Sequence, residues 1–220
     1  MPKRKLRIYL ADLANELVEI DNKSIPIGIG YIAAYCIKKY GERADVHVFR
    51  TFAPFEREVK NTPPDILGLG SYDWNFNLTL NAANFVKSVN PDCLTVMGGA
   101  NAEINPTDNV EFLSANPQID TLVYGDGEYP FASLVDKYLE AENASDRIDE
   151  IKRIPIDGVR SLVDGELVMG MPTDIVRDMD ELPSPYLTGL FDDLLENPDL
   201  MPILQNVRGC PYLCKYCVSG

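Results

Sequence analysis

The run Asp65-Ile-Leu-Gly-Leu-Gly-Ser-Tyr72 is almost continuously apolar, ends in small residues, and precedes a helical pattern over 77–89. Apolar residues without alternation are typical of a strand buried on both faces of a parallel sheet. Two further strand and helix pairs follow, with strands over 94–98 and 121–124 and helices over 106–115 and 129–140. The pattern predicts a parallel sheet covered by helices on both faces.

The preceding residues extend the same alternation toward the amino end. We expect a buried strand over 7–13, an apolar helix over 27–40 and a second strand over 45–50. Pro26 at the start of that helix and Gly41 just after it are the usual boundary residues. Residues 1–140 are therefore predicted to form a doubly wound α/β domain, flavodoxin-like or Rossmann-like, with five parallel strands.

The character of the sequence changes after about residue 141. A charged stretch over 146–152 precedes two short apolar runs that flank Asp164 and Gly165, a pair typical of a tight β-hairpin. We expect residues 141–200 to be a connector that contains this hairpin. Residues 201–220 are expected to be the start of a second domain, with its first strand over 201–207.

The composition excludes several classes of function. The 220 residues carry 20 Lys and Arg against 34 Asp and Glu, a formal net charge of -14. This charge argues against nucleic-acid binding, because that affinity comes from clustered cations that displace counterions. We see no apolar run that could span a bilayer and no cleavable leader, so we expect no membrane span. Free thiols then fit a reducing cytoplasm.

The ends of the predicted strands indicate where a ligand would bind. Open parallel sheets bind ligands beyond the carboxyl ends of the strands, where the strand order reverses. In a flavodoxin-like order this place lies between the first and third strands, at Asp12 and at Ser71 and Tyr72. The third, fourth and fifth strands end in small residues: Gly68, Gly70 and Ser71, then Gly98, Gly99 and Ala100, then Gly125 and Gly127. Small residues allow close approach to backbone N–H groups, so these ends predict a bulky ligand.

Three cysteines near the carboxyl end, Cys210, Cys214 and Cys217, have the spacing C-x3-C-x2-C on a loop marked by Gly and Pro. Three thiolates can bind one metal centre, and an iron–sulfur cluster held in this way keeps one iron free of protein ligands. A structural zinc site usually has four Cys or His ligands, and the other candidates lie in distant apolar segments. A disulfide is disfavoured by the odd count of five cysteines.

This loop resembles the cluster loop of the radical S-adenosylmethionine (radical SAM) enzymes. The resemblance implies a 4Fe-4S cluster on the three cysteines, with the open iron chelated by S-adenosylmethionine. Tyr216, the residue before the third cysteine, would then lie beside the adenine. In that family a barrel follows the loop, so we expect the missing radical SAM barrel to be the partner of this domain. The 220 residues alone are expected to be inactive.

The first 140 residues resemble the cobalamin-binding (B12-binding) domain that precedes the barrel in a large class of these enzymes. The resemblance rests on three stretches, Pro-Ile-Gly-Ile-Gly-Tyr-Ile-Ala-Ala over 26–34, Val-Met-Gly-Gly-Ala over 96–100 and Val-Tyr-Gly-Asp-Gly-Glu over 123–128. It implies that the nucleotide tail of cobalamin is buried against the sheet. The residues expected to contact the cofactor are Ser71, Gly98, Gly99 and Gly125, with Asp12 and Tyr72 at the strand ends.

One departure from the cobalamin pattern concerns the cobalt ligand. Domains of the methionine-synthase kind carry D-x-H-x-x-G, whose histidine ligates cobalt, but the stretch here is Asp12-Leu-Ala-Asn-Glu-Leu17. The only histidine, His47, lies in the second predicted strand and is expected to be structural. The expected cofactor is therefore cobalamin without a histidine lower ligand.

Several alternatives compete with this interpretation. Residues 28–33 match the dinucleotide fingerprint G-x-G-x-x-A, but about a dozen residues separate them from the first strand, whereas the fingerprint needs a tight turn. Close packing of the helix on the sheet is the preferred explanation for Gly28 and Gly30. The aromatics around Trp74 could contact a corrin, meet the barrel or form a local core. Asp126 and Glu128 adjoin a helix start, where the helix dipole favours carboxylates.

These patterns together predict the amino-terminal part of a cobalamin-dependent radical SAM enzyme. The parent enzyme would be a methyltransferase or would catalyse a related radical transformation. The alternative is a B12-type domain that binds no cobalamin and serves to cover the barrel.

Overall fold

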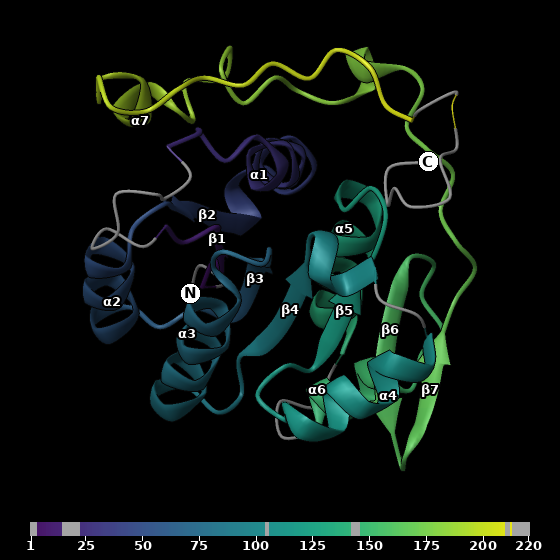
Figure 1. The fold of residues 1–220 in the computed structure, drawn as a ribbon. Coiled ribbons are helices and arrows are strands. Elements are labelled where there is room, and N and C mark those ends of the chain that lie inside the picture. The colour runs from purple at the N-terminus through teal and green to yellow at the C-terminus, as the bar shows by residue number, and fades with distance from the viewer. Residues whose placement is uncertain (1–3, 15–22, 104–105, 142–145, 210–211, 213–220) are drawn as a thin grey trace.

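A sheet of seven strands runs through the described part of the chain, in the order β2-β1-β3-β4-β5-β6-β7 (Figure 1). This computed structural model describes residues 4–14, 23–103, 106–141, 146–209 and 212. The first five strands are parallel, and β6 and β7 are antiparallel to their neighbours. The strands are β1 (Leu6–Ala11), β2 (Ala44–Phe49), β3 (Ile66–Gly70), β4 (Leu94–Gly98), β5 (Thr121–Val123), β6 (Val159–Val163) and β7 (Glu166–Met169).

Helices cover both faces of this sheet (Figure 1). The helices are α1 (Ile27–Tyr40), α2 (Phe52–Asn61), α3 (Phe76–Val89), α4 (Pro106–Ala115), α5 (Glu128–Glu140), α6 (Arg147–Lys152) and α7 (Asp192–Leu195), with 3-10 turns at Gly41–Arg43, Ala100–Glu103 and Met179–Glu181. One buried core joins α1 and α5 to the sheet, and a second joins α2, α3 and α4 to its other face. The predicted doubly wound α/β fold is confirmed, and of its two predicted variants the strand order is the flavodoxin-like one.

The register of the parallel strands brings the small residues side by side. Gly70 at the end of β3 pairs with Gly98 at the end of β4, and Gly68 lies between Leu10 of β1 and Val96 of β4. All of these residues lie toward the carboxyl edge of the sheet. The register therefore places residues without side chains next to each other at the edge where the sequence predicted a ligand.

Helix α2 was missed in the sequence, as were the short helices α6 and α7. Helix α2 lies between β2 and β3, and it buries Phe55 and Val59 while most of its other side chains reach solvent. Residues four positions apart share one face of a helix, so this pair forms a short apolar stripe. Pro54 and the charged residues around this stripe hid it from a search for continuous apolar runs.

The predicted hairpin is present, and its two strands, β6 and β7, extend the sheet beyond β5. Its turn has positive φ at Asp164 (52°) and Gly165 (85°), as a two-residue hairpin turn requires. Strand β6 pairs with β5, with Ser161 opposite Thr121. Because an edge strand exposes unpaired N–H and C=O groups, the hairpin protects an edge that a five-stranded sheet would expose at β5. The proposed domain boundaries at 140 and 200 stay predictions.

The C-terminal strap, residues 171–209, crosses over α1 (Figure 1). Phe191 of the strap is fully buried, and a Cβ added at Gly30 of α1 would lie only 2.2 Å from its ring. Packing against the strap, and not against the sheet, therefore explains Gly30. The strand expected over 201–207 is limited to a bridge between Ser24 and Met201, because Pro202 has no N–H to continue a ladder.

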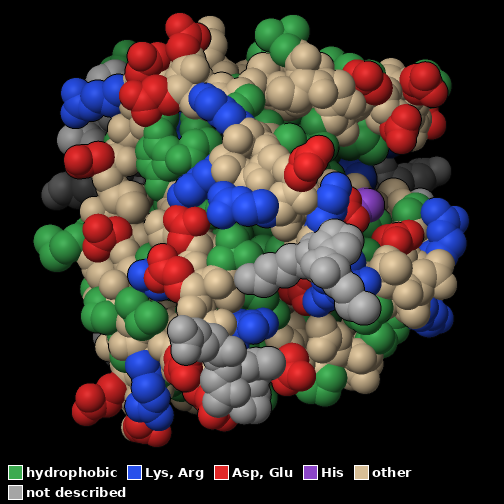
Figure 2. Space-filling model, turned by 180° about the vertical axis from the view of Figure 1, so that it is seen from behind, with side chains coloured by type: hydrophobic (Ala, Val, Ile, Leu, Met, Phe, Trp, Pro, Cys, Tyr) green, Lys and Arg blue, Asp and Glu red, His purple; other side chains and the backbone are tan. Residues whose placement is uncertain are grey.

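Acidic and basic side chains are interspersed on the face shown in Figure 2. Within the described ranges, no helix combines the length and the apolarity that crossing a membrane requires.

Candidate cofactor-binding site

A cavity of about 200 Å³ opens at the carboxyl edge of the parallel strands, between the sheet, α1 and α5. Apolar side chains from the sheet and from both helices form much of its wall, among them Leu10, Ile32, Val123 and Phe131. The lining also includes seven glycines: Gly28, Gly68, Gly70, Gly98, Gly99, Gly125 and Gly127. The cavity therefore combines an apolar interior with a rim of exposed backbone.

Two glycines of the lining allow the apolar wall of the cavity to pack closely. A Cβ at Gly68 would lie 2.5 Å from Leu10 Cδ2 and 2.8 Å from the Phe131 ring, and one at Gly127 would lie 2.9 Å from Ile32 Cδ1. Side chains at these positions would compete for space with the apolar wall. Gly68 and Gly127 therefore leave room for Leu10, Phe131 and Ile32 in the wall of the cavity.

The ends of β3 and β4 are joined so closely that one glycine is obligatory. Gly99 has a φ of +90°, and a Cβ there would lie 2.6 Å from the Ser71 carbonyl oxygen. The Ser71 N–H donates to the Gly98 carbonyl at 2.8 Å, and the Asn101 side-chain amide donates to the Ser71 hydroxyl at 3.2 Å. Ser71 is fully buried and belongs to this junction, and it is not among the residues that line the cavity.

The sequence-predicted contacts divide into three groups. Gly98, Gly99, Gly125 and Tyr72 line the cavity. Ser71 and Asp12 lie at the same edge of the sheet but are not part of the lining. Tyr216, Cys210, Cys214 and Cys217 lie outside the described residues. The roles of all these residues in cofactor binding stay predictions.

Asp12 lies where the strand order reverses, and its contacts are with other residues of that edge. Arg50 Nη1 donates to the Asp12 main-chain oxygen at 2.7 Å and lies 3.3 Å from the Asp12 carboxylate. The Asn75 amide donates to the same carboxylate at 3.0 Å and to the Gly70 carbonyl at 3.2 Å. This buried network ties the ends of β1, β2 and β3 together.

Tyr72 and Trp74 form a stacked aromatic pair at the rim of the cavity. Their ring centroids are 4.7 Å apart with an interplanar angle of 5°. Tyr72 lines the cavity, whereas Trp74 is 53% exposed. Trp74 is therefore not part of a buried core, and an aromatic surface lies beside the opening.

The single histidine lies on a strand that contributes no residue to the cavity. His47 is in β2, its Nε2 lies 3.2 Å from the Asp45 carboxylate, and its ring contacts Tyr9 edge-on. The cavity lining contains no histidine. The geometry agrees with the structural role expected for His47.

The strap supplies part of the cavity wall that the sequence did not reveal. Gln205 and Arg208 line the cavity beside the turn that contains Asp126 and Glu128. Arg208 Nη1 donates to Glu128 Oε2 at 2.8 Å and lies 3.1 Å from Asp126 Oδ2, while Nη2 donates to Glu128 Oε1. Burial lowers the pKa of Arg208, but its bonds to Glu128 and the charges of both carboxylates outweigh burial and raise it. The one sequence feature that distinguishes Arg208 is its position two places before Cys210, and this position does not reveal the contact with Glu128.

The cavity suits one end of a large, flat heteroaromatic cofactor. Its apolar interior can bury a planar ring, its glycine rim exposes backbone groups, and Tyr72 lies at its opening. A corrinoid held here would receive no histidine ligand from this cavity.

The fold and the cavity define a parallel α/β domain that binds a ligand beyond the carboxyl ends of its strands. The chain belongs to the B12 binding domain family, whose model matches residues 17–135.

Two curated relatives are methyltransferases. The 2-(S-pantetheinyl)-carbapenam-3-carboxylate methyltransferase of Streptantibioticus cattleyicolor is 35% identical over 164 residues, which are 72% of this chain and 22% of the relative. The cobalamin-dependent radical SAM methyltransferase TokK of Streptomyces tokunonensis is 31% identical over 162 residues, 71% of this chain and 22% of the relative. The matched part of the chain thus spans 22% of the length of both relatives.

A solved structure shares the fold. The cobalamin-dependent S-adenosylmethionine radical enzyme OxsB, with aqua-cobalamin and S-adenosylmethionine bound, superposes with a TM-score of 0.71 at 19% identity, over 97% of this chain and 28% of that chain. The resemblance found in the sequence is therefore confirmed: this B12-binding domain is related to cobalamin-dependent radical SAM methyltransferases.

Proposed function

We propose that this chain binds cobalamin in the cavity, without a histidine below the cobalt, as part of a cobalamin-dependent radical SAM methyltransferase. The observation that carries the proposal is a glycine-lined cavity at the carboxyl edge of the sheet. The chain that contains it belongs to the B12-binding family. The nucleotide tail would lie among the apolar residues between α1, α5 and the sheet. The corrin would lie over the strand ends, near Tyr72.

Bound methylcobalamin would supply a methyl group to a substrate radical. The residues of this chain bind and orient the cofactor and keep water from its buried end. Leu10, Val96 and Phe131 exclude water from the interior of the cavity, and the backbone around Gly98 and Gly125 offers polar groups at the rim. Tyr72 and Trp74 present an aromatic surface at the opening.

The second part of the proposal concerns the cluster. Cys210, Cys214 and Cys217 would bind a 4Fe-4S cluster, S-adenosylmethionine would bind its open iron, and Tyr216 would contact the adenine. The spacing of the three cysteines supports this assignment. Such a cluster, together with the free thiols of Cys36 and Cys93, fits the reducing cytoplasm, which we propose as the location of the protein.

The third part is a partner domain. Large apolar side chains on the strap face solvent, among them Leu187 (91% exposed), Leu204 (83%) and, just beyond the strap, Tyr212 (81%). Exposed apolar residues gathered on one segment are typical of an interaction surface. We propose that a radical SAM barrel covers this segment.

Hydroxocobalamin tests the first part. The protein is incubated anaerobically with it and passed through a gel filtration column while the visible spectrum of the protein peak is recorded. Corrin absorbance in the peak supports the proposal. Trp74, the only tryptophan, gives a second readout, because a corrin near it would quench its fluorescence. Without co-eluting corrin or quenching, the alternative of a cobalamin-free covering domain is favoured.

Iron and sulfide assays after anaerobic reconstitution test the cluster. The wild type is assayed first, to establish that this chain assembles a cluster. A variant with Cys210, Cys214 and Cys217 changed to Ala should then contain only background iron. The matched control changes Cys36 and Cys93, the two buried free thiols, and should keep the wild-type iron content. Iron retained by the triple variant would contradict the ligand assignment.

A further inference from the structure

The end of the strap and the start of α5 meet at one buried ion pair. Arg208 stands two positions before the first cysteine of the triplet, and its side chain is only 6% exposed. Glu128, the first residue of α5, has a side chain that is 3% exposed. Both residues also line the cavity. The same contact thus belongs to the cavity wall and to the segment that leads into the cysteines.

Several contacts hold Arg208 in place. Its guanidinium binds both oxygens of Glu128, a forked arrangement that fixes direction as well as distance. Asp126 lies 3.1 Å away and also accepts a hydrogen bond from the Val176 N–H at 3.0 Å. The guanidinium carbon lies 5.5 Å from the ring centre of Tyr31, whose hydroxyl donates to the Gln205 carbonyl at 3.1 Å.

Separating Arg208 from Glu128 would cost free energy, because a buried charge would lose its partner. If the strap lifted, the buried carboxylate of Glu128 would lose both hydrogen bonds from Arg208. The cavity would also lose the part of its wall that Gln205 and Arg208 provide. A ligand that touches this wall therefore binds the docked strap better than the lifted strap.

We propose that Arg208 is a positioning residue that couples ligand binding in the cavity to the placement of the cysteine-bearing segment. The inference rests on the proposed function, because the ligand is the corrinoid and the cysteines are the cluster ligands. A coupling of this kind is reciprocal, so the docked strap raises the affinity for the corrinoid as much as the corrinoid favours docking. The turn over 125–128 transmits the effect, since it lines the cavity and also binds Arg208.

Trypsin offers a direct measurement, because it cleaves after Arg208. This bond is protected while the side chain is buried in its ion pair, so cleavage requires the strap to open. Arg153, which is outside the strap with a side chain 59% exposed, provides an internal reference cut. The measured quantity is the rate of cleavage after Arg208 divided by the rate after Arg153, with and without hydroxocobalamin.

The main variant is Glu128→Gln, and the matched control is Glu181→Gln. Glu181 also joins the strap to α5, through a 2.7 Å bond from the Tyr129 hydroxyl, but it does not line the cavity. Glu128→Gln should raise the relative cleavage after Arg208 about tenfold or more and weaken hydroxocobalamin binding by a similar factor. Hydroxocobalamin should protect the bond strongly in the wild type and in Glu181→Gln, and only weakly in Glu128→Gln.

The outcomes separate this inference from the proposed function. If the wild type binds no hydroxocobalamin, the proposed function fails and the coupling fails with it. If the wild type binds it and Glu128→Gln shows the same affinity and protection, the coupling alone is wrong. Should Glu128→Gln not fold, Arg208→Lys replaces it, because lysine keeps the charge and the trypsin site but cannot form the fork. Wild-type behaviour of Arg208→Lys would then overturn the inference.

Discussion

The side-chain amide of Asn75 donates a 3.0 Å hydrogen bond to the Asp12 carboxylate, which also lies 3.3 Å from the buried guanidinium of Arg50. These contacts join the ends of β1, β2 and β3, and Asp12 is not among the residues that line the cavity. Removing one partner of a buried ion pair leaves the other charge uncompensated. We predict that Asp12→Ala lowers the free energy of unfolding by about 3–5 kcal/mol.

Urea unfolding checks this prediction. Below the transition, the folded variant should bind hydroxocobalamin with nearly wild-type affinity, because Asp12 does not line the cavity. A stable variant with lost corrinoid binding would instead make Asp12 a direct cofactor contact, as the sequence suggested.

The adjacent glycines at the end of β4 should respond differently to the same substitution. A methyl group at Gly98 has room, since its nearest neighbour is the Val123 carbonyl at 3.4 Å, whereas Gly99 needs positive φ and touches the Ser71 backbone. We predict that Gly98→Ala changes the free energy of unfolding by less than about 1 kcal/mol, whereas Gly99→Ala lowers it by about 1–3 kcal/mol.

Corrinoid titrations complete that comparison. Because Gly98 lines the cavity, Gly98→Ala should weaken hydroxocobalamin binding severalfold while the protein remains fully folded. Unchanged affinity in Gly98→Ala, together with wild-type stability, would show that the ligand does not approach this strand end.

The sequence was sufficient for the five parallel strands, because buried strands and helices with clear boundary residues leave clear apolar runs. Helix α1, from Ile27 to Tyr40, was predicted to the residue since Pro26 and Gly41 mark its ends. Helix α2 was missed because two buried residues, Phe55 and Val59, make only a short stripe. Local pattern thus predicts an element best when most of its residues are apolar and its ends carry clear boundary residues.

The candidate site was only partly predictable for a related reason. Glycines at strand ends can be found from the order of the strands, and those at 98, 99 and 125 do line the cavity. Arg208 and Gln205 reach it from the strap, more than 75 positions after the turn they face, and no periodic pattern predicts such a long-range contact. Ser71 and Asp12 were placed at the correct edge, but side-chain direction decides whether an edge residue faces the cavity.

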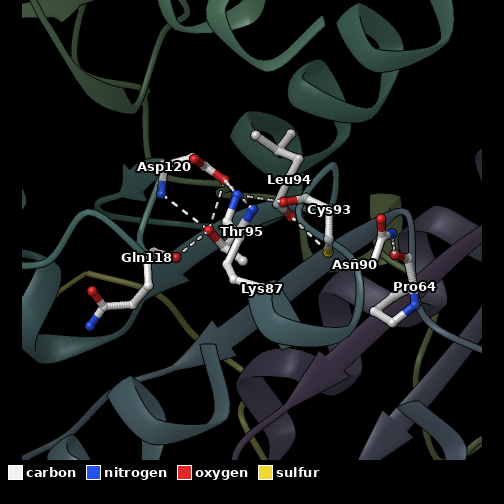
Figure 3. A network of polar contacts seen from close by, with 8 residues as sticks. All are labelled: Pro64, Lys87, Asn90, Cys93, Leu94, Thr95, Gln118 and Asp120. Atoms are coloured by element: carbon white, nitrogen blue, oxygen red, sulfur yellow. Dashed lines mark hydrogen bonds and ion pairs between the residues drawn. The ribbon is translucent and has the colours of Figure 1, made fainter. Parts of the chain in front are cut away.

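A buried polar network at the opposite edge of the sheet provides a test of stability without a role in binding. Asp120 Oδ2 accepts hydrogen bonds from Lys87 Nζ at 2.7 Å and from the N–H and hydroxyl of Thr95, both at 2.8 Å (Figure 3). Lys87 also donates to the Cys93 carbonyl at 2.8 Å. We predict that Asp120→Ala lowers the free energy of unfolding by about 3 kcal/mol or more.

The control for this network is Glu56→Gln, which breaks an exposed pair with Lys60 on α2. Its effect on the free energy of unfolding should stay within about 0.5 kcal/mol, because exposed ion pairs contribute little. Calorimetric melting of both variants gives the comparison, and equal effects would contradict the importance assigned to burial. Neither variant should alter corrinoid binding below its melting temperature.

The last prediction concerns the thiol of Cys36, which is fully buried in α1. Burial raises its pKa from about 9 to about 12, with Lys39 lowering it and Asp136 raising it by smaller amounts. Because thiolates are the reactive form, Cys36 should not react with a thiol reagent at pH 8 in the folded protein. Burial likewise raises the pKa of Cys93. In a Cys210, Cys214 and Cys217 to Ala background, both thiols should react only after denaturation.

The same shift sets a pH dependence of stability. Between pH 9 and 12 the folded state keeps the Cys36 proton and the unfolded state loses it, so this contribution is complete below pH 9 and is lost as the pH rises toward 12. Cys36→Ala removes the titrating group and should show a shallower loss of the free energy of unfolding over this range. Parallel curves for wild type and Cys36→Ala, or rapid labelling of Cys36 in the folded protein at pH 8, would mean that the thiol reaches solvent and that α1 opens more readily than its packing against α5 and the strap indicates.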